Sequence, residues 1–325
     1  MEKKQKVIIG AAAVCALLLI AGIAIFGKKQ ANIWYIDQNL ENSWTRILRN
    51  LRETEVPNKF VQIKVWDEAE IPAEAGILIT TNPRKTEEIV SVYPRLSWEL
   101  EHEGAIVVAL DPWMVFRKHT NPPLTVSRVF SETGGSGGAN ATGGANTAGM
   151  LLIPGREISA VRAWTSRFIM EEPGKFPSEY AIWQEWEREL FAANRFLPGA
   201  TGHDWHYAFF RLMGNDIVWV YAPLSQIRRY RDPNKSILEA TPFPETGSES
   251  SLQATILWAL PTGTEKNKKN LAKTIDWLKN PQTQTIIADA LEWIPADPYG
   301  TPYDPVSFTT QRVWLTAQWV YTVNK

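Results

Sequence analysis

The sequence predicts an α/β protein, and three observations support this fold class. Strand-like apolar segments alternate with segments of helical periodicity along most of the 325 residues. The stretch 257–297 combines a strand, two helices and an extended segment in one unit. The chain is 44% hydrophobic, which is enough to fill the cores of two domains or of one large domain.

The C-terminal unit is the best defined part of this prediction. The apolar run Thr255–Leu260 predicts a buried strand that ends at Pro261. A helix should follow, because apolar residues recur at i, i+4 and i+7, and it should stop where Asn280 precedes a proline. Pro281 can open a second helix, and Trp293–Ala296 then closes the unit as an extended segment. The apolar positions of the first helix are Leu271, Ile275 and Leu278.

Earlier in the chain, the same alternation predicts a parallel or mixed sheet with right-handed crossovers. A helix is also expected after Thr86, although Pro94 interrupts its apolar face of Ile89, Val90, Tyr93 and Leu96. In one of the strands, Val61, Ile63 and Val65 should form the buried face. The strands are expected at Ile33–Ile36, Phe60–Trp66, Gly76–Thr80, Gly104–Leu110 and Leu151–Pro154, and helices at Glu41–Arg52 and after Ser178.

Residues 131–149 interrupt this pattern. They consist almost entirely of Gly, Ala, Ser, Asn and Thr, and they carry no charge after Glu132, which predicts a flexible surface loop. A phosphate-binding loop would end in Gly-Lys-Ser/Thr before a helix, and this segment does not.

The N-terminal segment predicts a membrane anchor. Val7–Gly27 contains no charged residue over 21 positions, which is long enough to cross a hydrocarbon core as a helix. Lys3, Lys4 and Lys6 precede it, so the positive-inside rule places the rest of the chain outside the cytoplasm. An uncleaved anchor is favoured over a cleaved signal peptide, because the run is long and lacks a small-x-small exit. Lipidation of Cys15 is less favoured, since most of the apolar run follows that residue.

Four segments of the C-terminal unit, taken in order, resemble one protein family. They are Trp258–Thr264, Lys269–Leu278, Pro281–Gln284 and Trp293–Ala296. The family is the extracellular solute-binding proteins of bacterial ABC importers, in which an apolar strand precedes the patterns N-x-x-x-A-x-x-F-x-x-W-L, S/N-P-E-x-Q and G-x-x-P. Trp293 or a neighbour replaces the glycine of the last pattern. Weaker similarities lie in Leu100–Gly104, Val108–Trp113, Phe176–Trp186, Tyr207–Tyr221 and Thr241–Pro244.

The resemblance implies a two-lobed, periplasmic-binding-protein-like α/β fold behind an N-terminal transmembrane helix. We expect a cytoplasmic stub and anchor in residues 1–29, a first lobe in 30–130, the Gly-rich loop in 131–149 and a second lobe in 150–325. The implied function is binding of a small polar ligand, with carbohydrate as the leading class, and its delivery to the permease of an ABC importer. Lobe closure on the ligand would be the mechanism.

Four aromatic residues near predicted strand ends are the first ligand candidates. Sugars stack their C–H faces on indole rings, and the chain contains 15 Trp. Burial in a core is the alternative for each residue, and Asp111-Pro112 could instead start a short helix that covers Trp113. The candidates are Trp113, Trp219, Tyr221 and Trp293.

Four polar residues directly after predicted strands could supply hydrogen bonds to the ligand. Ligands of open α/β sheets bind outside the carboxyl ends of the strands. Turn or helix-cap chemistry is the alternative for each of these side chains. The residues are Asp37, Asn39, Thr81 and Asn82.

Other functions have less support. The net charge of -1 does not favour nucleic acid, and a single cysteine excludes a disulfide framework. A metal site at His203, Asp204 and His206 is less favoured than an exposed loop, because the spacing is not that of a helical zinc motif. Glu185, Glu187 and Glu189 are expected on one solvated helix face. No catalytic residue, metal or cofactor is therefore expected.

A second hypothesis belongs to another class. The chain between Leu190 and Tyr207 is shorter than in a typical family member, and the expected anchor is not a lipid. These two features and the Gly-rich insertion at 131–149 favour a degenerate binding-protein fold that serves as a membrane-anchored scaffold or sensor.

Overall fold

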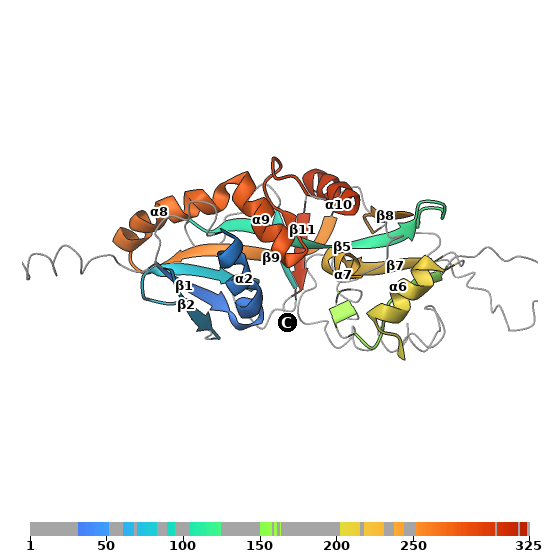
Figure 1. Cartoon of the computed structure of the whole chain (residues 1–325), viewed down its shortest axis with the longest axis horizontal. Coiled ribbons are helices and arrows are strands. Elements are labelled where there is room, and N and C mark those ends of the chain that lie inside the picture. Colours follow the sequence, from blue (N-terminus) through green and yellow to red (C-terminus); the bar gives the residue numbers. More distant parts are fainter. Residues whose placement is uncertain are drawn as a thin grey trace, which may run out of the picture.

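The computed structural model describes 32–51, 61–67, 70–82, 90–94, 104–124, 150–157, 159–160, 163, 202–214, 218–230, 237–243, 251–302, 304–317 and 319–323. In these residues eleven strands form one mixed sheet, which runs along the length of the molecule (Figure 1). The strands are β1 (Asn32–Asp37), β2 (Val61–Trp66), β3 (Gly76–Thr80), β4 (Val90–Pro94), β5 (Ile106–Lys118), β6 (Met150–Leu152), β7 (Val218–Pro223), β8 (Leu238–Thr241), β9 (Ser251–Thr262), β10 (Ile294–Pro295) and β11 (Trp319–Val323).

The helices lie on both sides of this sheet. A short 3₁₀ turn, η1 (Gln38–Leu40), leads from β1 into the first α-helix. Proline occupies the first position of two of the later helices, where its missing N–H has no cost. The helices are α2 (Glu41–Leu51), α6 (Trp205–Met213), α7 (Leu224–Arg229), α8 (Glu265–Lys279), α9 (Pro281–Leu291) and α10 (Pro305–Thr316).

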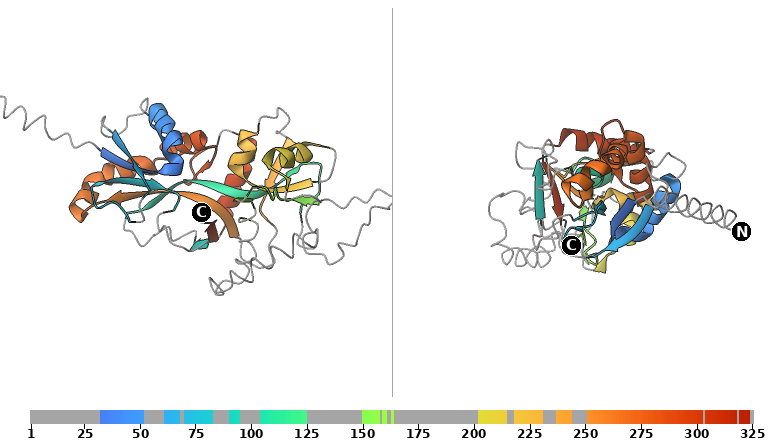
Figure 2. Two further views of the ribbon diagram at one scale, coloured as in Figure 1. Left: turned by 90° about the horizontal axis from the view of Figure 1, so that it is seen from below. Right: turned by 90° about the vertical axis from the view of Figure 1, so that its left-hand side faces the viewer.

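The central strands β5 and β9 divide the sheet into two halves. Along its main path the strand order is β2-β1-β3-β9-β5-β7-β6, with β1 parallel to β2 and β3. The first part of β5 pairs antiparallel with β9, and its last part pairs antiparallel with β7 and β8. We call β1, β2 and β3 with their helices the first half, and β6, β7 and β8 the second half. The left view in Figure 2 shows β5 and β9 in the middle of the molecule.

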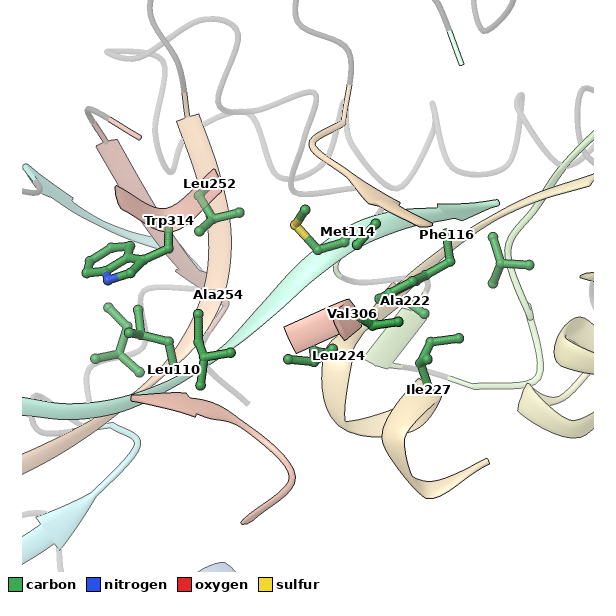
Figure 3. Packing of buried hydrophobic residues seen from close by; sticks show 14 of the residues in the cluster. Leu110, Met114, Phe116, Ala222, Leu224, Ile227, Leu252, Ala254, Val306 and Trp314 are labelled. Atoms are coloured by element: carbon green, nitrogen blue, oxygen red, sulfur yellow. The ribbon is translucent and has the colours of Figure 1, made fainter. Parts of the chain in front are cut away.

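Two buried clusters cover the two faces of the first half. On one face, α2, α8 and α9 pack on β1 and β3 around Trp34 and Trp44, which are both fully buried. On the other face, one continuous apolar cluster extends from Trp66 and Leu78 to Leu224 and Ile227 of α7. Figure 3 shows its central part around β5 and β9. The halves therefore share a packed core as well as two strands.

Most of the predicted elements in the described residues are present, with shifted ends. The strand expected at Thr255–Leu260 is longer, because β9 continues through Pro261, which lies opposite Ile77 of β3. In β2 the predicted buried face is wrong in part, since Val65 is 44% exposed and Trp66 only 2%. Trp66 joins the large cluster, and β2 is the edge strand.

Two expectations about local structure are wrong. The helix expected after Thr86 does not form at Val90–Pro94, which is instead β4 and pairs antiparallel with β11. Its alternating Val-Ser-Val-Tyr sequence suits a strand, and proline stands at the end of that strand, where its missing donor matters least. The alternative of a helix start at Asp111-Pro112 is also wrong, because β5 continues through both residues to Lys118.

Three predictions lie outside the described residues: the segment 1–29 with its expected anchor at 7–27, the Gly-rich loop 131–149, and the helix after Ser178 with Glu185, Glu187 and Glu189. Within the part of the chain that is described, no helix has both the length and the apolar character needed to cross a membrane.

Gly76 allows β3 to lie close against β1. A Cβ atom at this position would come within 2.6 Å of the carbonyl oxygen of Ile33 and 2.7 Å of the ring of Tyr35. We expect Gly76→Ala to lower the free energy of unfolding by about 1–3 kcal/mol, because the strand must shift to accept a methyl group. Urea unfolding followed by circular dichroism measures this loss. Gly202→Ala is the control, since nothing lies within 4 Å of its Cβ, and equal losses in both variants would contradict the assignment.

Candidate functional site

The parallel pairing of β1 and β3 brings their carboxyl ends to one edge of the sheet. Ile36 lies opposite Ile79, so the residues that follow them, Asp37 and Thr80, also come together. The Thr80 Oγ1 hydroxyl donates a hydrogen bond of 3.0 Å to Asp37 Oδ2. Both side chains are buried, with 7% of Asp37 and none of Thr80 exposed. This hydrogen bond fixes the carboxylate at the end of the first strand.

The neighbouring polar residues are arranged around this bonded pair. Asn39 donates its backbone N–H to Asp37 Oδ1 over 3.3 Å, and its side-chain amide lies 3.4 Å from the same oxygen. Asn82 donates its backbone N–H to Thr80 Oγ1 over 3.0 Å. Asn39 is exposed, whereas Thr81 and Asn82 are partly exposed. We call these five residues, Asp37, Asn39, Thr80, Thr81 and Asn82, the polar edge.

The polar edge therefore contains both turn chemistry and accessible polar groups. Asp37 caps η1 and orders the turn that leads into α2. This is the turn and cap role that the sequence predicts as the alternative to ligand binding. Its carboxylate is held by donors from Asn39 and Thr80. The more exposed amides and hydroxyl next to it can donate and accept hydrogen bonds, which is the chemistry that recognises a polyhydroxylated or polar ligand.

Three of the four aromatic candidates lie together in one core cluster instead. Trp113, Trp219 and Tyr221 have exposures of 7%, 1% and 0% and pack beside β5 and β7. The ring centroids of Trp113 and Tyr221 are 5.5 Å apart. The Trp219 indole N–H donates to the carbonyl of Pro122 over 2.9 Å, and the Tyr221 hydroxyl donates to Gln253 Oε1. The indole N–H of Trp219 and the hydroxyl of Tyr221 thus have partners inside the protein.

Trp293 belongs to a different cluster. It is 8% exposed and packs with α2, α8 and α9 on the first half. Its backbone carbonyl accepts a hydrogen bond of 3.0 Å from Arg228 Nη1. The structure therefore brings the four polar candidates together and leaves all four aromatic candidates in packed surroundings.

The segment around His203 starts a helix. The Asp204 side chain caps α6 by accepting the N–H of Tyr207 over 2.9 Å, and this hydrogen bond lowers the pKa of the carboxyl. The His203 ring stacks on Tyr207 with centroids 3.9 Å apart, and burial lowers the pKa of its imidazole. Across the described residues, no group of three His, Cys, Asp or Glu side chains is placed to hold a metal ion.

Sequence reasoning missed Thr80 and Asp111. Thr80 is the last residue of a predicted strand, and its position next to Thr81 was the available signal. Asp111 lies on β5 and accepts hydrogen bonds from Ser225, 2.9 Å from its N–H and 2.6 Å from its Oγ. Burial raises the pKa of Asp111 to about 6, although the hydrogen bonds from Ser225 act in the opposite direction. A charged residue inside an apolar strand pattern was the signal there.

Comparison with known proteins identifies the fold. No protein-family model matches the sequence, and no curated protein sequence does either. Many solved structures are similar in three dimensions. The bacterial solute receptor AcbH, described with an exclusive preference for β-D-galactopyranose, has a TM-score of 0.54 at 11% identity, over 90% of this chain and 87% of that chain.

Two other neighbours have different functions. A Bordetella ferric binding protein has a TM-score of 0.51 at 13% identity, over 87% of this chain and 90% of that one. Thiaminase I from Bacillus thiaminolyticus has a TM-score of 0.57 at 10% identity, over 90% of this chain and 94% of that one. Most of the similar structures are binding proteins, although thiaminase I shares the fold.

The chain thus has the mixed α/β fold of periplasmic solute-binding proteins. Proteins with this fold include sugar binders and ferric-ion binders. Since the neighbours differ in what they bind, the ligand class has to be argued from the side chains of this chain.

Proposed function

We propose that the protein is an extracytoplasmic solute-binding protein for a small polar ligand, with a sugar as the leading class. The observation that carries this proposal is the polar edge. It lies outside the carboxyl ends of two parallel strands, where open α/β sheets bind their ligands. Its accessible groups are amides and a hydroxyl rather than cations, which suits hydroxyl-rich ligands better than anions.

The proposed contacts are Asn39, Thr81 and Asn82, with Asp37 as the buried acceptor that orders them. For Trp113, Trp219, Tyr221 and Trp293, ligand contact stays a prediction, and their burial favours a packing role. Attachment to the membrane through 7–27 and delivery of the ligand to an ABC importer permease complete the proposal. Both rest on the charge pattern and on the resemblance in the sequence.

A second candidate function is supported by the same aromatic residues. Their rings pack against protein and do not line an accessible surface, so this chain offers few stacking partners for a sugar among them. A binding-protein fold that has lost its ligand would serve as a membrane-anchored scaffold or sensor. The two functions differ in whether a metabolite binds.

Thermal unfolding in the presence of candidate ligands tests the proposal. The panel holds monosaccharides, oligosaccharides, amino acids and ferric citrate. We expect a sugar to raise the melting temperature, because a ligand that binds only the folded state stabilises it by mass action. Stabilisation by ferric citrate alone would replace the sugar by iron, and no stabilisation by any compound would favour the scaffold.

The Asn39→Ala variant locates the binding. We expect its Kd for the stabilising ligand to rise about 3- to 10-fold, as for loss of one neutral hydrogen bond, with little loss of stability because Asn39 is exposed. Isothermal titration calorimetry measures the change. Gln282→Ala is the control, since Gln282 is an exposed polar residue in the first turn of α9 and is not one of the residues of the polar edge. An unchanged Kd in Asn39→Ala would place the ligand away from the polar edge.

A further inference from the structure

Arg228 of α7 contacts three acidic side chains at once. Its Nη2 atom lies 2.6 Å from Asp289 Oδ1, and its Nε atom lies 3.3 Å from Glu292 Oε2 and 3.1 Å from Asp304 Oδ2. Its Nη1 atom also donates to the carbonyl of Trp293 over 3.0 Å. The Arg228 side chain is only 11% exposed. Each of the three guanidinium nitrogens thus has at least one acceptor, and the planar group is the centre of the cluster.

The acidic partners of Arg228 belong to two helices, α9 and α10. Asp289 is in α9 and Glu292 caps the end of that helix, which packs on the first half. Asp304 caps the start of α10, where it also accepts the N–H and Oγ–H of Ser307. Arg228 itself is in α7, which follows β7 of the second half without a loop. One side chain therefore connects both halves and α10.

Helix α7 is also held at its other end. Asp111 of β5 accepts both the backbone N–H and the hydroxyl of Ser225 in the first turn of α7. Asp111 is close to the point where β5 changes its pairing partner. Asp111 lies opposite Thr255 of β9, whereas Trp113 lies opposite Pro223 of β7. The two ends of α7 are thus tied to the central strand and to the first half.

Apolar contacts between the two halves do not by themselves fix their relative position. Around the two central strands, Leu224 of α7 and Val306 of α10 belong to the same cluster as Leu110 and Ala254 (Figure 3). Such contacts are non-directional and tolerate small displacements of one element along another. Charge-assisted hydrogen bonds have a preferred geometry, so they stabilise one relative position of the two elements over the others.

We propose that Arg228, held by Asp289, Glu292 and Asp304, is a latch that fixes the second half of the sheet in one arrangement relative to the first. With the latch closed, the chain stays in the arrangement described above. Loss of the latch releases α7 from α9 and lets the halves move about β5 and β9. The latch concerns the protein itself and does not depend on which ligand binds, or on whether any does.

Arg117 provides a matched control. Its side chain is 12% exposed and lies 2.6 Å from Glu239, whose exposure of 44% equals that of Asp289. Arg117 is on the last part of β5 and Glu239 on β8, so this ion pair lies within the second half. Removing it takes away a similar partly buried ion pair without disconnecting the halves.

The test measures the distance between the halves in the full-length protein. Cys15→Ser removes the one native cysteine, and spin labels are placed at Lys273→Cys on α8 and His206→Cys on α6, both exposed positions. Pulsed electron paramagnetic resonance then gives the distance distribution without added ligand. We expect Arg228→Gln to raise the population of a second distance by roughly tenfold or more, because the variant loses the charged hydrogen bonds that only the latched arrangement makes.

Arg117→Gln should leave the distribution as in the parent protein. If Arg228→Gln does not fold, the double variant Asp289→Asn with Glu292→Gln opens the latch instead, because these carboxylates are 44% and 36% exposed and tolerate loss of their partner. A second distance in Arg228→Gln or in the double variant, but not in Arg117→Gln, supports the latch. An unchanged distribution in the folded latch variants, or the same change in Arg117→Gln, overturns it.

Discussion

Trp34→Ala is expected to lower the free energy of unfolding by about 3–5 kcal/mol, the range typical of aromatic truncations in a core. Trp34 is fully buried between β1 and the covering helices. Its ring lies 5.7 Å from that of Trp44 and 6.3 Å from that of Trp277, measured between centroids. The variant leaves a cavity where β1 meets α2 and α8, which the backbone cannot close. Urea unfolding followed by circular dichroism measures the loss.

Trp34→Phe separates packing from polarity at the same position. Among the described residues, the Trp34 indole N–H has no hydrogen-bond partner, so it is a buried donor that costs stability. Phenylalanine removes that donor and keeps most of the ring contacts. We expect a loss of less than about half that of Trp34→Ala. A loss as large as that of alanine would show that the ring contacts at this site contribute little.

The stability of the protein is expected to depend on pH through Asp111, with an unusual sign. Burial raises the pKa of Asp111 to about 6 in the folded protein, against about 3.9 in an unfolded chain. The folded state therefore binds the proton more tightly, so this residue's contribution is most favourable below pH 4. It is lost as the pH rises from about 4 to about 6, by on the order of 3 kcal/mol.

Asp111→Asn isolates this effect. The amide is neutral at every pH and can still accept the N–H of Ser225 and donate to its hydroxyl oxygen. Relative to the parent protein, the variant should gain stability between pH 4.5 and pH 8, as measured by urea unfolding at several pH values. Parallel pH profiles of the two proteins would refute the assignment. Arg228 and Arg229 of α7 are the charges that oppose the shift by favouring the carboxylate.

Glu74 provides a control, because its pKa is shifted in the opposite direction to that of Asp111. Hydrogen bonds from Lys64 and from the Tyr35 hydroxyl lower the pKa of this exposed carboxyl. A carboxyl with a lowered pKa contributes stability at neutral pH that disappears as the pH falls through the folded-state pKa. Glu74→Gln should therefore differ from the parent protein at pH 7 more than at low pH, the reverse of Asp111→Asn.

The elements predicted best are those whose apolar periodicity and end signals both lie within their own sequence. In α8 the stripe of Leu271, Ile275 and Leu278 is buried as expected, and the helix ends at Lys279, before Asn280-Pro281. By contrast, the local periodicity around β4 predicts a helix, whereas the segment pairs as a strand with β11, more than 220 residues later in the chain. Local periodicity cannot reveal a strand that is created by a distant neighbour.

For the candidate site, the sequence predicts the proximity of the polar residues, whereas ligand contact stays a prediction. Asp37, Asn39, Thr81 and Asn82 were chosen because they follow strands, and the parallel pairing of β1 and β3 brings them together. The aromatic candidates rest on residue type and on a predicted position near a strand end, and neither signal distinguishes an exposed ring from a buried one. The Arg228 cluster was missed because its partners are 61 to 65 residues away in the cases of Asp289 and Trp293, and nothing local marks them.

The position of β9 between β3 and β5 determines when the sheet can form during synthesis. Thr262 Oγ1 hydrogen-bonds the carbonyl of Glu74, a contact that spans 188 residues of chain. Until β9 leaves the ribosome, β3 and β5 each lack the neighbour that separates them in the finished sheet. Unpaired strand edges promote association between chains, and distant pairing is slow. These strand edges of β3 and β5 therefore stay unpaired until β9 (Ser251–Thr262) has been made, because a strand from late in the chain lies between two early ones.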